Sequence, residues 1–570
     1  MVNFQEKANF IWQVADDILR GNFKQHEYGD VILPFVVLRR LDCVLNGSKD
    51  EIIKTYEKYK KDLDEEQVKP ILLKTSGKNF YNISQYDLSR LVQDSKNIER
   101  NFNNYVNGFS KNVRDILENF QIDKIVTKLT KNDLLFQLVD KFTEIDLHPQ
   151  KVSNHEMGYI FEELIRKFSE MSNETAGEHY TPREVIRLMV NLLFAEHKDE
   201  LQGKGLIRTI FDPACGTGGM LTIAKEHIHQ KINPDLDVLM FGQEINEQTY
   251  AIAKSDFLVM GEDADNIRQK SSFNEDQFRG HRFNYMLSNP PFGVSWKKEQ
   301  KFIQSESEDP NGRFFAGLPR VSDGALLFLQ HMISKMDDSG SRIAIIFNGS
   351  PLFTGDAGSG ESNIRKWIIE NDWLEAIVAL PTELFYNTGI ATYIWIVTNR
   401  KPERRKGKVQ LINAVDYYQK MRKSLGNKRN YITDEQIEDI TNIYTSFTEG
   451  ENCRIFDNED FGYTKVTVER PTVSENGKIQ KDKLGNPKPD SSLRDYEKIP
   501  LKDDIAEYFK REVLPHVSDA WMDRNKDKIG YEISFNKYFY KYQKLRSLED
   551  IKKDILALEK ETEGLLNEVL

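Results

Sequence analysis

The amino-acid sequence predicts a doubly wound α/β sheet, with a helical domain before it and a helical extension after it. From about residue 206 to residue 398, β-rich runs alternate with helical stretches, which is the order of a sheet covered by helices. Polar or glycine-rich segments follow three of these runs, at the strand ends where such sheets bind ligands. Before residue 147 the apolar residues recur at helical spacing instead.

The length of the chain predicts several units rather than one compact domain. We divide its 570 residues into an N-terminal helical domain (1–150), a central α/β domain (151–472) and a C-terminal extension (473–570). The first boundary lies at His148-Pro149-Gln150. The second precedes residues 474–495, whose Lys, Asp, Gly, Pro and Ser content predicts an exposed hairpin or linker.

Composition limits the classes of protein that the chain can belong to. Hydrophobic residues make up 39% of the chain and charged residues 30%, and no apolar run approaches the length of a membrane span. The N-terminus has no signal-peptide pattern, so we expect a cytoplasmic protein without membrane contact. Cys43, Cys215 and Cys453 have no metal-ligand spacing, which predicts reduced thiols and no metal site.

The region before the sheet is predicted to be helical up to about Leu147, and it contains no catalytic constellation. We interpret it as a packing or docking module. Two further helices are expected at 158–168 and 184–194. The β-rich runs predict strands at 206–211, 236–241, 283–287, 342–347, 373–380 and 392–398.

The first predicted strand runs into a glycine-rich loop, Asp212-Pro213-Ala214-Cys215-Gly216-Thr217-Gly218-Gly219, which opens a helix near Met220. Glycine loops of this kind allow a cofactor to approach the backbone closely. The dinucleotide pattern G-x-G-x-x-G is not completed, because Leu221 stands where the third glycine would be. The acidic Asp212 also suits a sulfonium cofactor better than a pyrophosphate.

Acidic and amide side chains follow the next two predicted strands. Glu244 follows the strand at 236–241, where its carboxylate can accept hydrogen bonds from both hydroxyls of a ribose. Asn289-Pro290-Pro291-Phe292 follows the strand at 283–287. Asp212, Glu244 and Asn289 are therefore all expected at one edge of the sheet.

The Asn289-Pro290-Pro291-Phe292 motif suits chemistry on an exocyclic amino group. Such a nitrogen is a poor nucleophile because its lone pair is delocalised into the ring. The side-chain oxygen of Asn289 and the carbonyl of Pro290 would accept its two N–H bonds and localise the lone pair, while Phe292 stacks on the base. The alternative is an Asn-Pro turn that ends a strand.

With these motifs in order, the chain resembles the S-adenosylmethionine-dependent amino methyltransferases of DNA, which have a Rossmann-like sheet. It is most similar to the modification subunits of type I restriction-modification systems. Further motifs carry this resemblance: Gly177-Glu178-His179-Tyr180-Thr181-Pro182-Arg183, Asp323-Gly324-Ala325, Glu512-Val513-Leu514-Pro515-His516 and Gly530-Tyr531-Glu532-Ile533. The resemblance implies methylation of adenine N6 in DNA, with residues 151–472 as the catalytic domain and the target base flipped out of the duplex.

The resemblance also implies cofactor contacts. The segment Glu178, Tyr180, Thr181, Pro182 and Arg183 would close over the methionine end of S-adenosylmethionine, with Arg183 near its carboxylate. The glycine loop from Asp212 through Ala214, Cys215, Gly216, Thr217, Gly218 and Gly219 would cradle it, and Glu244 would hold the ribose. Asp263 is a candidate for the adenine amino group, although an acid in a surface loop is an equal alternative.

Other activities remain as alternatives. Methylation of cytosine N4 uses the same acceptors, and methylation of a protein glutamine or a non-catalytic DNA-targeting scaffold would use the same cofactor loop. No cysteine follows a proline, which argues against methylation of a ring carbon. The absence of G-x-x-x-x-G-K-[ST] argues against the ATP-driven translocase subunit.

The net charge of −11 is unusual for a protein that grips duplex DNA by itself. A basic segment at 400–429 is a candidate for phosphate contact, or else a solvated face. At the C-terminus, apolar residues at heptad-like spacing predict a coiled-coil seam that binds a partner: Leu548, Ile551, Ile555, Leu558, Leu565 and Val569, interrupted by Thr562. The resemblance implies two copies of this chain around one DNA specificity subunit, with a restriction/translocase subunit in the full complex.

Overall fold

The computed structural model describes residues 2–172, 181–386, 388–474, 478–482, 485–540 and 547–569. The chain forms two compact units, Met1–Ile533 and Ser534–Leu570. No described helix is long and apolar enough to cross a membrane.

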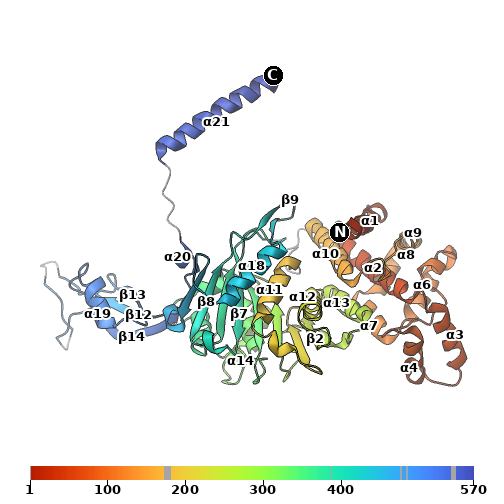
Figure 1. The fold of residues 1–570 in the computed structure, drawn as a ribbon, viewed down its shortest axis with the longest axis horizontal. Helices are drawn as coiled ribbons and strands as arrows, with labels where there is room; N and C mark the ends of the chain where they lie inside the picture. Colours follow the sequence, from red (N-terminus) through yellow and green to blue (C-terminus); the bar gives the residue numbers. More distant parts are fainter. Residues whose placement is uncertain are drawn as a thin grey trace. The chain divides into compact units, whose positions relative to one another are not determined.

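The N-terminal part of the first unit is helical, as the apolar spacing predicts (Figure 1). The helices are α1 (Val2–Leu19), α2 (Tyr28–Leu45), α3 (Lys49–Tyr59), α4 (Glu65–Ser76), α5 (Leu88–Leu91), α6 (Ile98–Asn107), α7 (Lys111–Asn119), α8 (Ile122–Lys131) and α9 (Leu135–Thr143). Helix α2 is buried on nearly all sides, which explains its continuous apolar sequence. Its core continues into that of the α/β part, because α2 and α7 both pack against α13 (Glu247–Met260).

A nine-stranded mixed sheet follows, in the order β11-β8-β6-β7-β5-β4-β1-β2-β3. Its strands are β1 (Ile207–Asp212), β2 (Asp237–Glu244), β3 (Ile267–Gln269), β4 (Tyr285–Ser288), β5 (Arg342–Asn348), β6 (Leu374–Ala379), β7 (Thr392–Thr398), β8 (Lys408–Asn413) and β11 (Cys453–Asp457). All six predicted strands are present, and the predicted fold class is confirmed. The strands β3, β8 and β11 were not predicted, and β3 and β11 form the two edges of the sheet.

The order of the strands creates a topological switch point. From β1 the chain passes outward to β2 and β3, and then returns to place β4 on the other side of β1. Strands β1 to β5 run parallel, whereas β7 is antiparallel to both β5 and β6. Ligands of open α/β sheets bind where the strand order reverses, so the ends of β1 and β4 are the expected place for a site.

Helices alternate with the strands along the chain, and several of them pack against the sheet. They are α10 (Asn154–Ser172), α11 (Arg183–Ala195), α12 (Gly219–His227), α13, α14 (Gln300–Ser307), α15 (Ala325–Ile333), α16 (Ser350–Phe353), α17 (Gly360–Glu370) and α18 (Asp434–Ser446). The helices predicted at 158–168 and 184–194 correspond to α10 and α11.

A second, antiparallel sheet lies after residue 461 and was not predicted. Strand β12 (Gly462–Glu469) pairs with β13 (Asp495–Pro500) on one side and β14 (Trp521–Tyr531) on the other. Val466, Val468 and Ile499 form its small core with two residues beyond the short helix α19 (Ile505–Tyr508). The strands of this sheet are largely polar, and β13 and β14 carry many charged residues, so their alternation is weak in the sequence.

The second unit contains α20 (Phe535–Phe539) and α21 (Leu548–Val569). The predicted C-terminal helix is therefore present. On its described part the seam residues Leu548, Ile551, Ile555 and Leu558 are 40–86% exposed. The side chains of Thr562, Leu565 and Val569 lie outside the described residues.

Candidate active site

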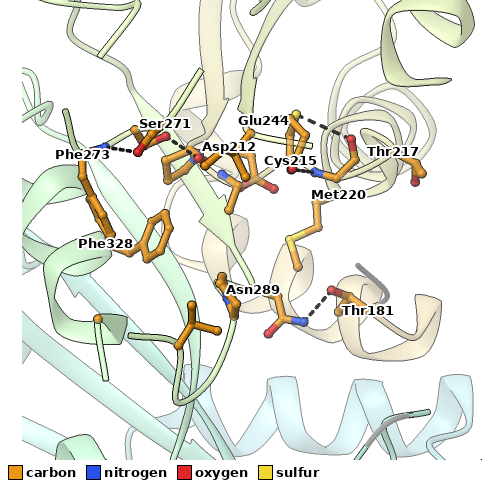
Figure 2. Close-up of a pocket in the computed structure, with 18 of the residues that line it drawn as sticks. Thr181, Asp212, Cys215, Thr217, Met220, Glu244, Ser271, Phe273, Asn289 and Phe328 are labelled. Atoms are coloured by element: carbon orange, nitrogen blue, oxygen red, sulfur yellow. Dashed lines mark hydrogen bonds between the residues drawn. The ribbon is translucent and has the colours of Figure 1, made fainter. Parts of the chain in front are cut away.

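A large pocket lies at the carboxyl ends of β1, β2 and β4, where the strand order reverses. It has about 1270 Å³ of empty space, counting the part that is open to solvent. That is room for a nucleoside-sized ligand with a second ring beside it. Figure 2 shows residues from the glycine loop, from the ends of the strands and from the start of α11 converging on this space.

The glycine loop forms one wall of the pocket through Pro213, Ala214, Cys215, Gly216, Thr217 and Gly219. Gly216 and Gly218 have φ angles of 53° and 81°, which residues with a Cβ rarely adopt. Gly218 is the N-cap of α12, so the loop delivers the N-terminus of that helix to the pocket. The backbone can therefore approach a ligand without an intervening side chain.

Two acidic residues hold the loop in this shape. The Asp212 carboxylate accepts hydrogen bonds from the Ala214 N–H at 2.9 Å and from the Ser288 hydroxyl at 3.0 Å. The Glu244 carboxylate accepts from the Gly216 N–H and the Asn246 N–H, both at 2.8 Å. Burial raises the pKa of Asp212 to about 7, because it disfavours the ionised carboxylate. Both hydrogen bonds to Asp212 are accepted by Oδ1, so its Oδ2 keeps acceptor capacity, as do both oxygens of Glu244, each of which accepts one bond.

Asn289 lies across the pocket from these acids, with the Met220 side chain extending between them (Figure 2). Its side-chain nitrogen donates to the Thr181 hydroxyl at 2.9 Å. Its side-chain oxygen is buried and has no hydrogen-bond partner among the described residues. A buried acceptor without a donor costs free energy unless a ligand supplies the donor. The Asn289 oxygen is thus an acceptor whose missing donor a bound group would supply.

The rest of the Asn289 motif divides between two environments. Pro291 lines the pocket, whereas Pro290 is buried behind it. The half-buried ring of Phe292 packs edge-on against Phe385, with 6.4 Å between the ring centroids. Phe292 is not among the described residues that line the pocket, and it contacts the segment before β7 instead.

The structure brings together most of the residues that the sequence singled out, but not all of them. Thr181 lines the pocket, and Pro182 is the N-cap of α11. Arg183 is buried outside the lining, where its guanidinium pairs with Glu162 at 3.0 Å and covers the Tyr159 ring. Asp263 is exposed and accepts from the Asp265 N–H, away from the pocket. Glu178 and Tyr180 lie outside the described residues.

Comparisons with known proteins agree with this geometry. The family model described as N-6 DNA methylase matches residues 152–477, more than half of the chain, and a second model, the HsdM N-terminal domain, matches residues 7–142. The chain belongs to the N-6 DNA methylase family. The predicted family of N6-adenine DNA methyltransferases is thereby confirmed.

Individual relatives are similar to this methylase in sequence, and one solved structure is similar to it in fold. The chain is 28% identical over 488 residues to the type I restriction enzyme MjaIX methylase subunit of Methanocaldococcus jannaschii, covering 83% of this chain and 82% of the relative. It is 30% identical over 304 residues to the EcoEI methylase subunit of Escherichia coli, covering 52% of this chain and 56% of the relative. The type I methyltransferase subunit of Streptococcus thermophilus shares the fold, with a TM-score of 0.62 at 23% identity, covering 80% of this chain and 97% of that one.

The methylase pocket also contains residues that the sequence did not single out. Lys270, Ser271, Ser272 and Phe273 follow strand β3 and line the pocket, together with Trp296, Glu299 and Phe328. The Ser271 hydroxyl donates to the Glu299 carboxylate. The rule that ligands bind at strand ends also covers β3, but a strand of three residues has too short a pattern to predict. These residues, rather than Asp263, supply the polar and aromatic groups on the β3 side of the pocket.

Proposed function

We propose that this methylase transfers a methyl group from S-adenosylmethionine to N6 of adenine in duplex DNA, as the modification subunit of a type I restriction-modification complex. The observation that carries the proposal is the Asn289 amide at the switch point, whose oxygen is buried without a partner among the described residues. An acceptor in that state is suited to a donor that arrives with the substrate.

The residues around the glycine loop fit S-adenosylmethionine. We propose that Asp212, Ala214, Cys215, Gly216, Thr217, Gly219 and Glu244 hold it, with Thr181 at the edge. The carboxylate of Glu244 keeps acceptor capacity for the ribose hydroxyls, and Asp212 in its ionised form would attract the cofactor's sulfonium cation. When bound, this cofactor supplies an electrophilic methyl carbon. Phe273 and Phe328, whose rings are 4.5 Å apart, provide an apolar surface for its adenine ring.

The chain's own residues prepare the target nitrogen. The hydrogen bond from the Asn289 nitrogen to Thr181 fixes the amide and leaves its oxygen without a partner among the described residues. That oxygen and the Pro290 carbonyl would accept the two N–H bonds of the amino group, so that its lone pair is directed at the methyl carbon. Adenine N6 lies inside the stacked duplex, so the base must be flipped out to reach this position. Phe292 would stack on the extruded base.

Cytosine N4 is the competing target, because its amino group would use the same two acceptors. Membership of the N-6 DNA methylase family favours adenine. Long-read sequencing of host DNA, with and without an intact copy of this gene, distinguishes the targets. We expect methylated adenines at one sequence motif that disappear with the gene. Modified cytosines, or an unchanged pattern, would contradict the proposal.

A leucine at Gly219 is expected to weaken S-adenosylmethionine binding by about tenfold or more, because a side chain would fill the pocket at a cost of roughly 1–3 kcal/mol. Gly219 lines the pocket, and a Cβ there meets nothing within 4 Å, so the backbone is not strained. Calorimetric titration measures the affinity. The matched control is Gly450→Leu, since Gly450 also has open space around it but lies outside the pocket. Equal affinities for Gly219→Leu and wild type would place the cofactor elsewhere.

The proposed complex contains this chain, duplex DNA, a DNA specificity subunit and a restriction/translocase subunit, with two copies of this chain per specificity subunit. The relatives named above as type I methylase subunits support this composition.

We propose the cytoplasm as the location of this chain, because its three cysteines are free and buried, which fits a reducing compartment. The division into residues 1–150, 151–472 and 473–570 is likewise a proposal, with the docking function assigned to α21.

Removing residues 541–570 is expected to prevent assembly with the specificity subunit while S-adenosylmethionine binding stays unchanged. Helix α21 presents its apolar seam to solvent and belongs to the smaller unit, so its loss leaves the pocket intact. Co-purification measures assembly.

Two further variants distinguish the contribution of the apolar seam to partner binding from that of the charge of α21. Ile551→Asp combined with Ile555→Asp lowers the net charge by the same amount as Lys553→Asp, but only the first pair places charges in the seam. We expect the isoleucine variant to lose the partner and the lysine variant to keep it. Assembly of the truncated chain would show that another surface binds the specificity subunit.

A further inference from the structure

The basic segment at 400–429 divides into residues with acidic partners and residues without them. Eight of its eleven basic side chains form ion pairs: Arg400 with Glu200, Lys401 with Asp372, Arg404 and Arg405 with Glu196, Lys406 with Glu403, Lys408 with Asp457, Lys428 with Glu184, and Arg429 with Glu383. These charges are partly compensated by acidic neighbours, two of which, Glu196 and Asp457, each pair with two cations. They are therefore weaker candidates for phosphate contact than basic residues without an ion pair.

The other three basic residues lie together on one strand. Lys420, Arg422 and Lys423 belong to β9 (Gln419–Leu425), which pairs with β10 (Lys428–Tyr431) in a separate two-stranded hairpin (Figure 1). All three are exposed, and none forms an ion pair within the described residues. On a chain with a net charge of −11, this strand is a local concentration of unpaired positive charge.

The base of the hairpin is firmly attached to the segment at 382–386. The Lys428 ammonium is buried, where it donates to the Leu384 carbonyl at 2.9 Å and pairs with Glu184. The Asn430 side chain donates to the Thr382 carbonyl at 3.0 Å, and the Asn427 N–H donates to the Tyr386 carbonyl at 2.9 Å. Strand β9 is thus the positively charged strand of a hairpin whose base is fixed to the segment at 382–386.

The base of the hairpin is connected to the Asn289 motif in two ways. Phe385, in the segment to which the hairpin is attached, contacts the ring of Phe292. Glu184, which pairs with Lys428, is in the first turn of α11, three residues after the Thr181 that orients Asn289. The charged strand is therefore anchored directly beside the place where the target base would be held.

We propose that β9 binds the phosphate backbone of the duplex next to the flipped base, through Lys420, Arg422 and Lys423. This inference rests on the proposed function. Backbone contacts position a protein on DNA without reading its sequence, and each neutralised phosphate releases counterions. A base flipped out for methylation needs its flanking backbone held in place, because unstacking costs a few kcal/mol in the free duplex. Strand β9 would hold the flanking DNA backbone, while a partner reads the sequence.

The test uses the full chain in its complex with the specificity subunit, and a fluorescein-labelled duplex that carries the site methylated by the wild type. Lys420→Gln, Arg422→Gln and Lys423→Gln are combined in one variant. We expect affinity to fall by about tenfold or more at low salt, and the slope of log affinity against log salt to decrease by roughly 2 to 3, about 0.9 per lost phosphate contact. Methylation at limiting DNA concentration should fall in parallel.

Two controls match this variant. Arg400→Gln, Lys406→Gln and Lys408→Gln together remove the same charge from the same segment, but from residues that form ion pairs, and should leave the salt slope unchanged. Exchanging Lys420 and Lys423 for arginine and Arg422 for lysine keeps the charge and should keep the slope. Calorimetric binding of S-adenosylmethionine verifies that each variant has an intact pocket.

Several results would overturn the inference. An unchanged salt slope in the glutamine variant would show that β9 does not contact phosphates. Loss of the specificity subunit from that variant would make the hairpin a protein-binding surface instead. A wild-type complex that methylates no DNA would reject the proposed function itself, which distinguishes that failure from a failure of the hairpin alone.

Discussion

Replacing Asn289 by alanine is expected to lower the methylation rate by about a hundredfold or more while S-adenosylmethionine binding is retained. The amide oxygen is a buried acceptor in a residue that lines the pocket, and Thr181 accepts a hydrogen bond from the amide nitrogen. The cofactor wall is built by other residues, chiefly the glycine loop and Glu244. Radiolabelled methyl transfer to duplex DNA measures the rate, and calorimetry measures the cofactor affinity.

Two companion variants sharpen this prediction. Thr181→Val removes the group that orients the amide but keeps the acceptor, so the rate should fall less than with Asn289→Ala. Asn371→Ala is the matched control, because Asn371 is exposed and its side chain donates to the Trp367 carbonyl within α17. Near-normal turnover of Asn289→Ala would remove this residue from the catalytic assignment.

Replacing Glu375 by alanine is expected to lower the free energy of unfolding by about 3–5 kcal/mol, because it leaves a buried guanidinium without its counter-charge. Arg342 on β5 and Glu375 on β6 are both fully buried and form two hydrogen bonds of 3.0 Å. Tyr444 from α18 also contacts both groups, so the pair joins three elements of the sheet's second half. Urea unfolding followed by circular dichroism measures the loss.

The pair also sets a pH dependence. Burial by itself would raise the pKa of the Glu375 carboxyl, but the adjacent Arg342 guanidinium outweighs burial and lowers the pKa below its ordinary value of 4.5. The stabilisation by this pair is therefore complete above about pH 4.5 and is lost as the pH falls toward the lower pKa of the folded state.

Control variants distinguish the loss of stability from breaking the buried pair from the loss caused by breaking a surface ion pair. Arg400→Ala breaks an exposed pair with Glu200 and should cost no more than about 1 kcal/mol. Arg342→Met combined with Glu375→Leu should recover much of the stability, because neither member of the pair is left buried alone and the buried Arg405 keeps its ion pair with Glu196. A loss of less than about 1 kcal/mol for Glu375→Ala would mean that water reaches Arg342 and compensates its charge.

The sequence by itself was sufficient to predict the strands, helices and motifs that local residue patterns encode. Long buried strands such as Arg342–Asn348 and Thr392–Thr398 are continuous apolar runs, and the period of the N-terminal helices reports which of their faces is buried. The glycine loop and the Asn289 motif were equally visible, because unusual backbone geometry requires glycine and proline. Their common position at one sheet edge followed from the parallel arrangement alone.

Only the tertiary structure decided which partners those residues have. Arg400 pairs with Glu200 and Arg405 with Glu196, about two hundred residues away in the chain, so a basic run that resembles a DNA-binding segment is mostly neutralised. Arg183 pairs with Glu162, and Ser271 rather than Asp263 lies in the pocket. A charged side chain carries no local signal of its counter-ion, because that choice depends on which distant strands and helices the fold brings together.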